Sequence, residues 1–373
     1  MTAQPTSAPP PALGAPTVLV IDDSAVVRQF MLQLAKRRRD LVVVTAADPM
    51  IAENKLLQFR PDVILLDLEM PRMTGLEFLR RQMRRDPLPV VVCSSYATAG
   101  SEQAIAALAE GAVDILPKPK LGVRQYFDAS ADELVEILRA AAAARLDRRS
   151  PAVPPSQPAR RSLAVALSGE SDAILGIGAS TGGPQALDLL LSALPSPFPP
   201  IVVVQHMPPS FTAAFAQRLD GRSALDIREA VDGEILVPGM ARIAPGGQHL
   251  LVDRRRGAYM TRIDSGPPVV RHRPSVDVLF RSLAAAAGAH AAAALLTGMG
   301  RDGAEGLLEL RRAGARTLTQ DESSAVVFGM PREAIVLGAS EQTLPLEAMP
   351  EWFSRWAAAA PAAAPLIVDE RAR

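Results

Sequence analysis

Short apolar runs alternate with amphipathic segments through the first third of the chain. Continuous runs of valine, isoleucine and leucine occupy residues 18–21, 41–44, 63–66 and 90–92. After the first run, apolar side chains recur at helical spacing, at Val26, Val27, Phe30, Met31 and Leu34. Because the runs lack polar alternation, we predict a parallel α/β sheet that is buried on both faces by helices.

A second α/β pattern begins near residue 174. An apolar run at 174–178 leads into the sequence STGGP at 180–184, and an amphipathic segment follows at 185–194. Pro184 suits a first helical position, where its missing N–H has no cost. Further strands are predicted at 201–204 and 291–296, whereas the Pro-Gly turns of 236–252 indicate short strands. We predict a doubly wound α/β domain with a small antiparallel region inserted.

The two patterns are separated by a stretch rich in alanine and proline. It contains few large apolar residues, so we predict a linker over residues 140–171. The predicted organisation is a disordered extension at 1–16, a first domain at 17–139, the linker, a second domain at 172–350 and a tail at 351–373.

Composition narrows the classes of function. Hydrophobic residues make up 48% of the 373 residues and charged residues 21%, as in globular proteins. Lys plus Arg and Asp plus Glu each number 40, which favours neither nucleic acid nor an anionic membrane as a partner. The single cysteine, Cys93, excludes an intrachain disulfide. Since no signal peptide or long apolar stretch is visible, we expect a cytoplasmic protein without direct membrane insertion.

Charged and hydroxyl residues follow the predicted strands of the first domain. Asp22 and Asp23 come after the first strand, Asp67 and Ser94 end later strands, and Lys118 follows residues 114–117. Functional groups of parallel sheets gather beyond the carboxyl ends of the strands, so we expect these five together. Three carboxylates repel one another unless a hard dication joins them, and oxygen ligands suit Mg²⁺. Taken alone, Asp22 or Asp23 has another explanation, as the N-cap of the helix that follows.

These residues resemble the response-regulator receiver domains. The matching segments are Asp22-Asp23, residues 67–75 (DLEMPRMTG), Ser94-Ser95 and Lys118-Pro119, over residues 18–139. The resemblance implies a flavodoxin-like five-stranded parallel sheet and phosphorylation of Asp67. It also implies Asp22, Asp23 and Asp67 as Mg²⁺ ligands, with Ser94 and Lys118 contacting the phosphoryl group as switch residues.

A candidate nucleophile lies at the start of the second domain. Residues 178–182 (GASTG) fit the G-x-S-x-G pattern in which a tight strand-to-helix turn exposes a serine, here Ser180. A glycine-rich phosphate loop or a plain turn has the same local pattern. Ser180 therefore needs a base and an orienting carboxylate before hydrolase chemistry is indicated.

Only four histidines are available as the base. His206 follows the predicted strand 201–204 and stands at its carboxyl end, whereas His249, His272 and His290 lie in a Gly-rich turn, a basic loop and an Ala-rich segment. We therefore favour His206, with a structural buried histidine as the alternative. Asp302 follows strand 291–296 through a glycine-rich loop and is the candidate carboxylate; a helix N-cap is its other explanation. We expect the same loop to bring a backbone N–H, that of Met299, towards a developing oxyanion.

The order Ser, His, Asp differs from that of α/β-hydrolases, but a triad is defined by its geometry. The second domain resembles the chemotaxis protein-glutamate methylesterases, the CheB family. The matching segments are residues 178–184, 203–209, 274–280, 296–306, 320–322 and 327–333.

The resemblance implies hydrolysis of glutamate methyl esters on methyl-accepting chemotaxis receptors, with release of methanol and no cofactor for the ester reaction. Some family members also deamidate receptor glutamines. A chemotaxis histidine kinase would donate the phosphoryl group, and the unphosphorylated receiver would cover the hydrolase site. We expect a monomer that does not bind nucleic acid.

Two other outputs remain as alternatives. A DNA-binding output would require a helix-turn-helix with a basic helix, which the Gly-rich, near-neutral second domain does not resemble. A purely interacting output would keep the α/β fold and leave Ser180 and His206 with structural roles only.

Overall fold

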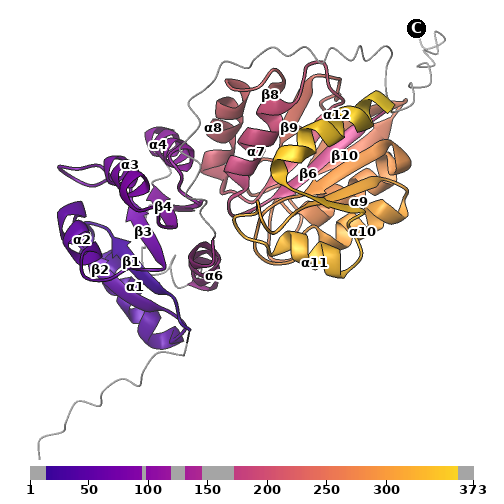
Figure 1. Ribbon diagram of the computed structural model, residues 1–373. Helices are drawn as coiled ribbons and strands as arrows, with labels where there is room; N and C mark the ends of the chain where they lie inside the picture. Colours follow the sequence, from indigo (N-terminus) through magenta and orange to yellow (C-terminus); the bar gives the residue numbers. More distant parts are fainter. Residues whose placement is uncertain (1–13, 95–97, 119–130, 145–171, 360–373) are drawn as a thin grey trace, which may run out of the picture. The chain divides into compact units, whose positions relative to one another are not determined.

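The computed structural model describes residues 14–94, 98–118, 131–144 and 172–359. The chain divides into two compact units, Met1–Ala152 and Val153–Arg373 (Figure 1). Each unit is built on its own parallel sheet.

The first unit contains a five-stranded sheet of order β2-β1-β3-β4-β5, in which every neighbouring pair is parallel. Its strands are β1 (Thr17–Ile21), β2 (Val42–Ala46), β3 (Val63–Asp67), β4 (Val90–Ser94) and β5 (Asp114–Pro117). Its helices are α1 (Ala25–Arg38), α2 (Pro49–Leu56), α3 (Gly75–Arg85), α4 (Thr98–Ala109) and α6 (Ala131–Ala142). The predicted flavodoxin-like order is confirmed, because β1 lies between β2 and β3.

The second unit contains a seven-stranded sheet of order β14-β13-β12-β6-β7-β9-β8, and all its pairs are parallel. Its strands are β6 (Ile174–Ala179), β7 (Ile201–Gln205), β8 (Asp226–Glu229), β9 (Met240–Ile243), β12 (Ala291–Leu295), β13 (Arg316–Gln320) and β14 (Gln342–Leu344). A separate antiparallel hairpin joins β10 (His249–Arg255) to β11 (Ala258–Asp264).

Helices cover both faces of the second sheet (Figure 1). They are α7 (Gly183–Ala193), α8 (Pro209–Asp220), α9 (Val276–Ala286), α10 (Ala304–Arg312), α11 (Met330–Val336) and α12 (Met349–Ala359), with 3₁₀ turns η1 (Gly288–His290) and η2 (Leu346–Ala348). Helix α7 contacts α8 and α12, whereas α10 contacts α9 and α11. Helix α9 lies so close to β6 that a Cβ on Gly176 would come within 2.4 Å of the Leu283 side chain. The predicted doubly wound α/β class is confirmed.

The predicted antiparallel region was placed too early in the chain. Within residues 236–252, strand β9 belongs to the parallel sheet and pairs with β7 and β8. The antiparallel pair is instead formed by residues 249–264. Two charged positions near the tip, Arg254 and Arg255, hid the alternation of this hairpin in the sequence.

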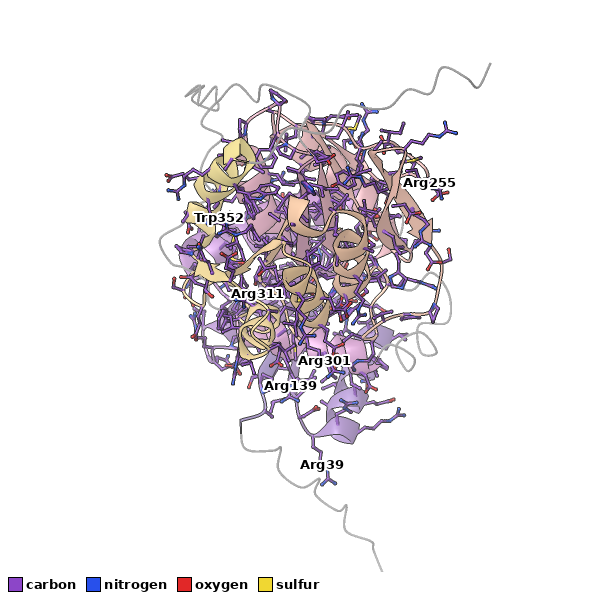
Figure 2. The ribbon with its side chains drawn as sticks, turned by 90° about the vertical axis from the view of Figure 1, so that its right-hand side faces the viewer. Arg39, Arg139, Arg255, Arg301, Arg311 and Trp352 are labelled. Atoms are coloured by element: carbon purple, nitrogen blue, oxygen red, sulfur yellow. The ribbon has the colours of Figure 1, made fainter. Side chains whose placement is uncertain are left out.

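The predicted C-terminal tail at 351–373 is wrong for its first nine residues, which belong to α12. Phe353 on this helix is fully buried. Trp352 Nε1 donates to Gln342 Oε1 at 2.9 Å, and the Arg316 guanidinium carbon lies 5.5 Å from the centre of the Trp352 ring. Figure 2 labels Trp352 on this helix. The alanine-rich composition concealed a helix that Phe353 and Trp352 attach to the rest of the unit.

Two other boundaries shift slightly. Helix α6 continues to Ala142, beyond the predicted domain end at 139, because Ala140 and Ala141 are buried. At the predicted N-terminal extension, the Pro16 carbonyl accepts a hydrogen bond from Val42 N at 2.9 Å, so this residue belongs to the fold. Residues 1–13 of the predicted extension and 145–171 of the predicted linker lie outside the described residues.

Over the part of the chain that the structure describes, none of the helices has the length and apolarity needed to span a bilayer.

Candidate active site

The acidic residues of the first unit meet at the carboxyl ends of its strands. Oxygens of Asp22, Asp23 and Asp67 all lie within 4.8 Å of one another. Lys118 Nζ lies 2.5 Å from Asp67 Oδ2 and 3.8 Å from Asp22 Oδ2. Four of the five predicted residues are therefore brought together by side-chain geometry. Ser94 is buried, and its carbonyl accepts from Lys118 N at 2.7 Å, which joins the ends of β4 and β5.

This cluster holds more negative charge than the protein neutralises. Burial raises the pKa of Asp22 to about 6 against the pull of Lys118, and repulsion from Asp67 adds to the rise. Burial also raises the pKa of Asp67 despite the neighbouring ammonium. A hard dication would offset this repulsion, and all three acidic side chains offer oxygen ligands. The cluster is consistent with a Mg²⁺ site.

Ser180 lies in the tight turn between β6 and α7. Its carbonyl accepts from Gly183 N at 2.7 Å, and its N–H donates to Thr297 O at 3.0 Å. Gly182 has a φ of 77°, which only glycine adopts without strain. A Cβ on Gly183 would lie 2.0 Å from the Gln205 side chain. These two glycines permit the sharp turn that presents Ser180 at the N-terminus of α7.

The loop after β12 lies against Ser180. A Cβ on Gly298 would come within 2.7 Å of the Ser180 Cβ, so glycine is required for this approach. Gly298 N donates to Val327 O at 2.9 Å, and its carbonyl accepts from Met330 N at 2.8 Å. These bonds hold Met299, the predicted oxyanion donor, in the loop beside the serine.

His206 and Asp302 form the pair that the sequence predicts. His206 Nε2 lies 2.8 Å from Asp302 Oδ2. The ring is almost buried, and its Nδ1 is buried without a hydrogen-bond partner among the described residues. No hydrogen bond joins Ser180 Oγ to His206 in this part of the chain. The unpartnered Nδ1 is the ring atom left to accept a proton.

Gln205 connects the nucleophile to the base. Its side-chain amide donates to the carbonyl of Ser180 at 2.9 Å and to that of His206 at 3.1 Å. His206 N also donates to Ala179 O at 3.0 Å. The ends of the neighbouring strands β6 and β7 are thereby held together, which positions two residues that lie far apart in the sequence.

Asp302 is fully buried and accepts four hydrogen bonds. Beside the His206 contact, its oxygens accept from Ser275 Oγ at 2.7 Å, Val276 N at 2.8 Å and Asp277 N at 3.2 Å. Burial acts to raise the pKa of Asp302, but the hydrogen bond and charge of His206 and the bonds from Ser275 and Val276 hold it below its usual value. The carboxylate therefore stays ionised in a dry site at the N-terminus of α9.

Comparison with known proteins identifies both units. Residues 18–124 match the family model of the response regulator receiver domain, and residues 175–353 match that of the CheB methylesterase. The chain is 51% identical over 350 residues to protein-glutamate methylesterase/protein-glutamine glutaminase 1 of Anaeromyxobacter dehalogenans, covering 92% of this chain and 99% of that protein. It is 50% identical over 343 residues to enzyme 2 of Xanthomonas campestris, covering 89% and 97%. The chain belongs to the CheB methylesterase family.

Among solved structures, the CheB methylesterase catalytic domain of Thermotoga maritima is 40% identical, covers 49% of this chain and 98% of its own, and gives a TM-score of 0.49. The predicted family and enzyme class, a protein-glutamate methylesterase/glutaminase carrying a receiver domain, are confirmed by the relatives.

One residue of this methylesterase site was missed by the sequence analysis. His272 stacks on His206, with ring centroids 3.9 Å apart and planes 10° from parallel. Burial, together with the charge of the neighbouring His206, lowers the pKa of His272 to about 3. The ring is thus a neutral wall of the site. Its place in a basic loop between Arg271 and Arg273 carried no signal of this contact.

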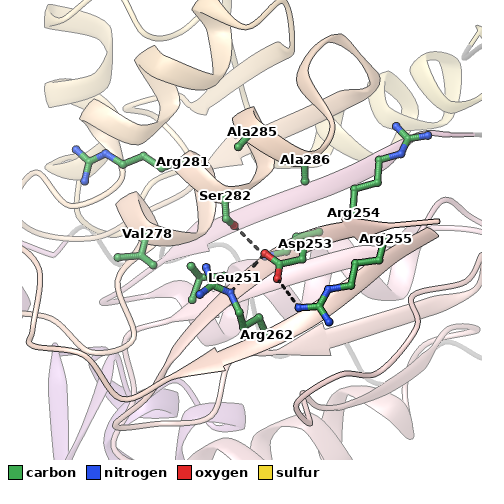
Figure 3. Close-up of a pocket in the computed structure, with 11 residues that line it drawn as sticks. Leu251, Asp253, Arg254, Arg255, Arg262, Val278, Arg281, Ser282, Ala285 and Ala286 are labelled. Carbon is green, nitrogen blue, oxygen red and sulfur yellow. Dashed lines mark hydrogen bonds and ion pairs between the residues drawn. The ribbon is translucent and has the colours of Figure 1, made fainter. Parts of the chain in front are cut away.

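The methylesterase unit also has a cavity of about 570 Å³ between α9 and the β10–β11 hairpin (Figure 3). Ser180, His206 and Asp302 do not line it. Its arginines already have carboxylate partners: Arg254 with Asp172, Arg255 and Arg262 with Asp253, and Arg281 with Glu305 and Glu309. The cavity therefore presents no unpaired cation, and the candidate chemistry lies elsewhere, at the strand ends.

Proposed function

We propose that this chain removes methyl groups from glutamate side chains of methyl-accepting chemotaxis receptors, with Ser180 as nucleophile, His206 as base and Asp302 as its orienting partner. One observation carries the assignment. Asp302 can only accept a hydrogen bond, so the His206 proton lies on Nε2 and the buried Nδ1 keeps a free lone pair.

In the first half-reaction, Ser180 Oγ attacks the ester carbonyl carbon while its proton passes to His206 Nδ1. The tetrahedral oxyanion faces the Met299 N–H and the N-terminus of α7, both of which favour negative charge. The bond to the methoxy oxygen then breaks, and His206 returns the proton to give methanol.

Water completes the cycle. His206 takes a proton from water, the resulting hydroxide attacks the acyl carbon, and Ser180 leaves with the proton held by His206. The products are free serine and a glutamate carboxylate. The same steps on a glutamine side chain release ammonia, which is the glutaminase reaction in the relatives' names.

The receiver unit supplies control in this proposal. A chemotaxis histidine kinase donates a phosphoryl group to Asp67, with Ser94 and Lys118 as its contacts. Asp22, Asp23 and Asp67 would hold Mg²⁺, which neutralises negative charge on the transferring phosphoryl group. We further propose that the unphosphorylated receiver covers the hydrolase site and that phosphorylation releases it.

The esterase assignment is tested by methanol release from methylated receptor membranes. Ser180→Ala should lower release by at least about a thousandfold, because it removes the hydroxyl that attacks the ester. Ser192→Ala, the same change farther along α7, serves as the matched control and should leave release unaltered. Turnover by Ser180→Ala within a few fold of wild type would exclude the assignment.

Control by phosphorylation is tested with acetyl phosphate and Mg²⁺ on the full chain. Both should be needed to raise methanol release, and Asp67→Asn should remove the rise, whereas Asp86→Asn at the C-terminus of α3 should keep it. Residues 172–359 alone should be more active than the unphosphorylated chain; equal activity would contradict the covering model.

A further inference from the structure

A second buried histidine is connected to Asp302 through the carboxylate oxygen that His206 does not contact. His249 begins β10 and is 2% exposed. Its Nδ1 lies 3.2 Å from Ser275 N, and its Nε2 lies 3.1 Å from Pro267 O. Ser275 Oγ in turn donates to Asp302 Oδ1 at 2.7 Å. An unbroken series of hydrogen bonds therefore runs from the loop after β11, through His249 and Ser275, to the catalytic carboxylate.

Both partners of His249 demand the same tautomer. The Ser275 N–H is a donor, so Nδ1 must offer a lone pair. The Pro267 carbonyl is an acceptor, so Nε2 must carry the hydrogen. The ring is thus a neutral imidazole with each nitrogen used once.

The N–H of Ser275 belongs to a position whose hydrogen-bond acceptor normally comes from the same helix. Ser275 is the N-cap of α9, and the N–H of an N-cap residue is commonly bound by a Glu or Gln side chain at the third helical position. Helix α3 of this chain has that arrangement, since Thr74 N donates to Glu77 Oε2 at 3.0 Å. In α9 the third helical residue is Val278, which has no side-chain acceptor. His249 takes this role from a distant strand.

Three of the four donors to Asp302 come from the start of α9. Ser275 Oγ, Val276 N and Asp277 N come from three consecutive residues at the start of α9. If the Ser275 N–H lost its bond to His249, the N-cap could rotate and would move all three donors together. Asp302 would then no longer hold His206 in one tautomer. The N-cap acceptor is therefore linked to the geometry of the base.

We propose that His249 is a positioning residue for Asp302, acting through the Ser275 N–H. The proposal rests on the assignment of Ser180, His206 and Asp302 made above. In this proposal the bond from Ser275 N–H to His249 Nδ1 carries the positioning role, whereas the bond from Nε2 to Pro267 O only anchors the ring.

Two substitutions separate these bonds in the full chain. In His249→Asn the amide oxygen occupies the place of Nδ1 and keeps the acceptor for Ser275. In His249→Gln the amide reaches the place of Nε2 and keeps the donor to Pro267, but the Ser275 N–H is left without its partner. His290→Gln, in the 3₁₀ turn η1, is the matched control.

We expect His249→Gln to lower kcat for methanol release by about tenfold or more with KM within about twofold of wild type. His249→Asn should recover most of that loss. The proton shared by His206 and Asp302 should give a far-downfield NMR line that shifts in His249→Gln and stays in His249→Asn and His290→Gln. Thermal unfolding of each variant measures its folded fraction and so shows whether a loss of kcat comes from unfolding rather than from a displaced Asp302.

Equal kcat in the Asn and Gln variants would overturn the proposal, as would losses that follow the folded fraction with an unshifted proton line. If His206→Gln kept turnover, the assignment of the triad itself would be wrong. If His206→Gln abolished turnover while both His249 variants matched wild type, the triad would stand and only the role of His249 would fail.

Discussion

Asp67 and Asp302 occupy the same kind of place, beyond the carboxyl end of a parallel strand, yet their surroundings act in opposite directions. Asp67 is buried beside two other carboxylates, and burial raises its pKa above the usual value. Asp302 is equally buried, but four donors converge on it and its pKa is lowered. Location in the fold thus concentrates functional groups, and the immediate neighbours decide their chemistry.

The difference separates a carboxylate prepared for a cation and a phosphoryl group from one prepared to hold an imidazole. In the receiver, the remaining negative charge calls for a partner from solution. In the methylesterase unit, the protein's own N–H and O–H groups satisfy the charge, so the carboxylate is organised in advance. Neutralising a carboxylate should therefore have opposite effects in the two units.

The largest effect is expected at Asp302. Asp302→Asn keeps the shape but places an amide where His206 Nε2–H needs an acceptor, so the imidazole loses its tautomer. We expect kcat for methanol release to fall about a thousandfold to ten-thousandfold. Asp264→Asn, on the exposed end of β11, is the control. A loss below tenfold would show that Asp302 does not orient the base.

At Asp22 the same change should stabilise the protein. The folded-state pKa of about 6 lies above the ordinary 3.8, so the unfolded chain ionises first and stability falls as pH rises through this interval. Without Mg²⁺ at pH 7.5, Asp22→Asn should therefore raise the unfolding free energy of the receiver by about 3 kcal/mol.

Hydrogen exchange of β1 and β3 in urea measures this gain for the receiver alone. The gain should vanish near pH 3.5, where the Asp22 carboxyl is largely protonated in the folded and in the unfolded chain. Mg²⁺ should stabilise the wild type more than the variant. Equal stability of the two proteins at pH 7.5 would mean that the cluster carries no excess repulsion.

A smaller effect of opposite pH dependence is expected at His272. Its folded-state pKa of about 3 lies below the ordinary 6.5, so the unfolded chain binds the proton first and stability falls as pH drops below 6.5. His272→Phe keeps an aromatic face against His206 and removes this titration. At pH 4.5 the variant should have lost about 2.5 kcal/mol less than wild type, relative to pH 7.5.

Both tryptophans of the chain, Trp352 and Trp356, lie on α12, so their fluorescence follows unfolding of the methylesterase unit alone. Parallel pH curves for the wild type and His272→Phe would contradict a neutral His272 in the folded protein.

The sequence by itself determined both α/β units and the identity of the strand-end residues. Apolar runs longer than a turn specify buried parallel strands, and whatever follows such a strand must lie at the edge of the sheet. This reasoning reaches Asp22, Asp67 and Ser180 directly, since each stands beside its strand. His206 was selected over three other histidines for the same reason.

The tertiary structure alone decided which distant groups touch these residues. His272 and His249 lie in a loop and at the start of a hairpin, and no periodicity marks their contacts with His206 and Ser275. Helix α12 was hidden in the same way, because its stability comes from Phe353 packing on the rest of the fold. Local patterns encode elements and their ends, whereas hydrogen bonds and stacking between residues far apart in sequence exist only once the sheets have formed.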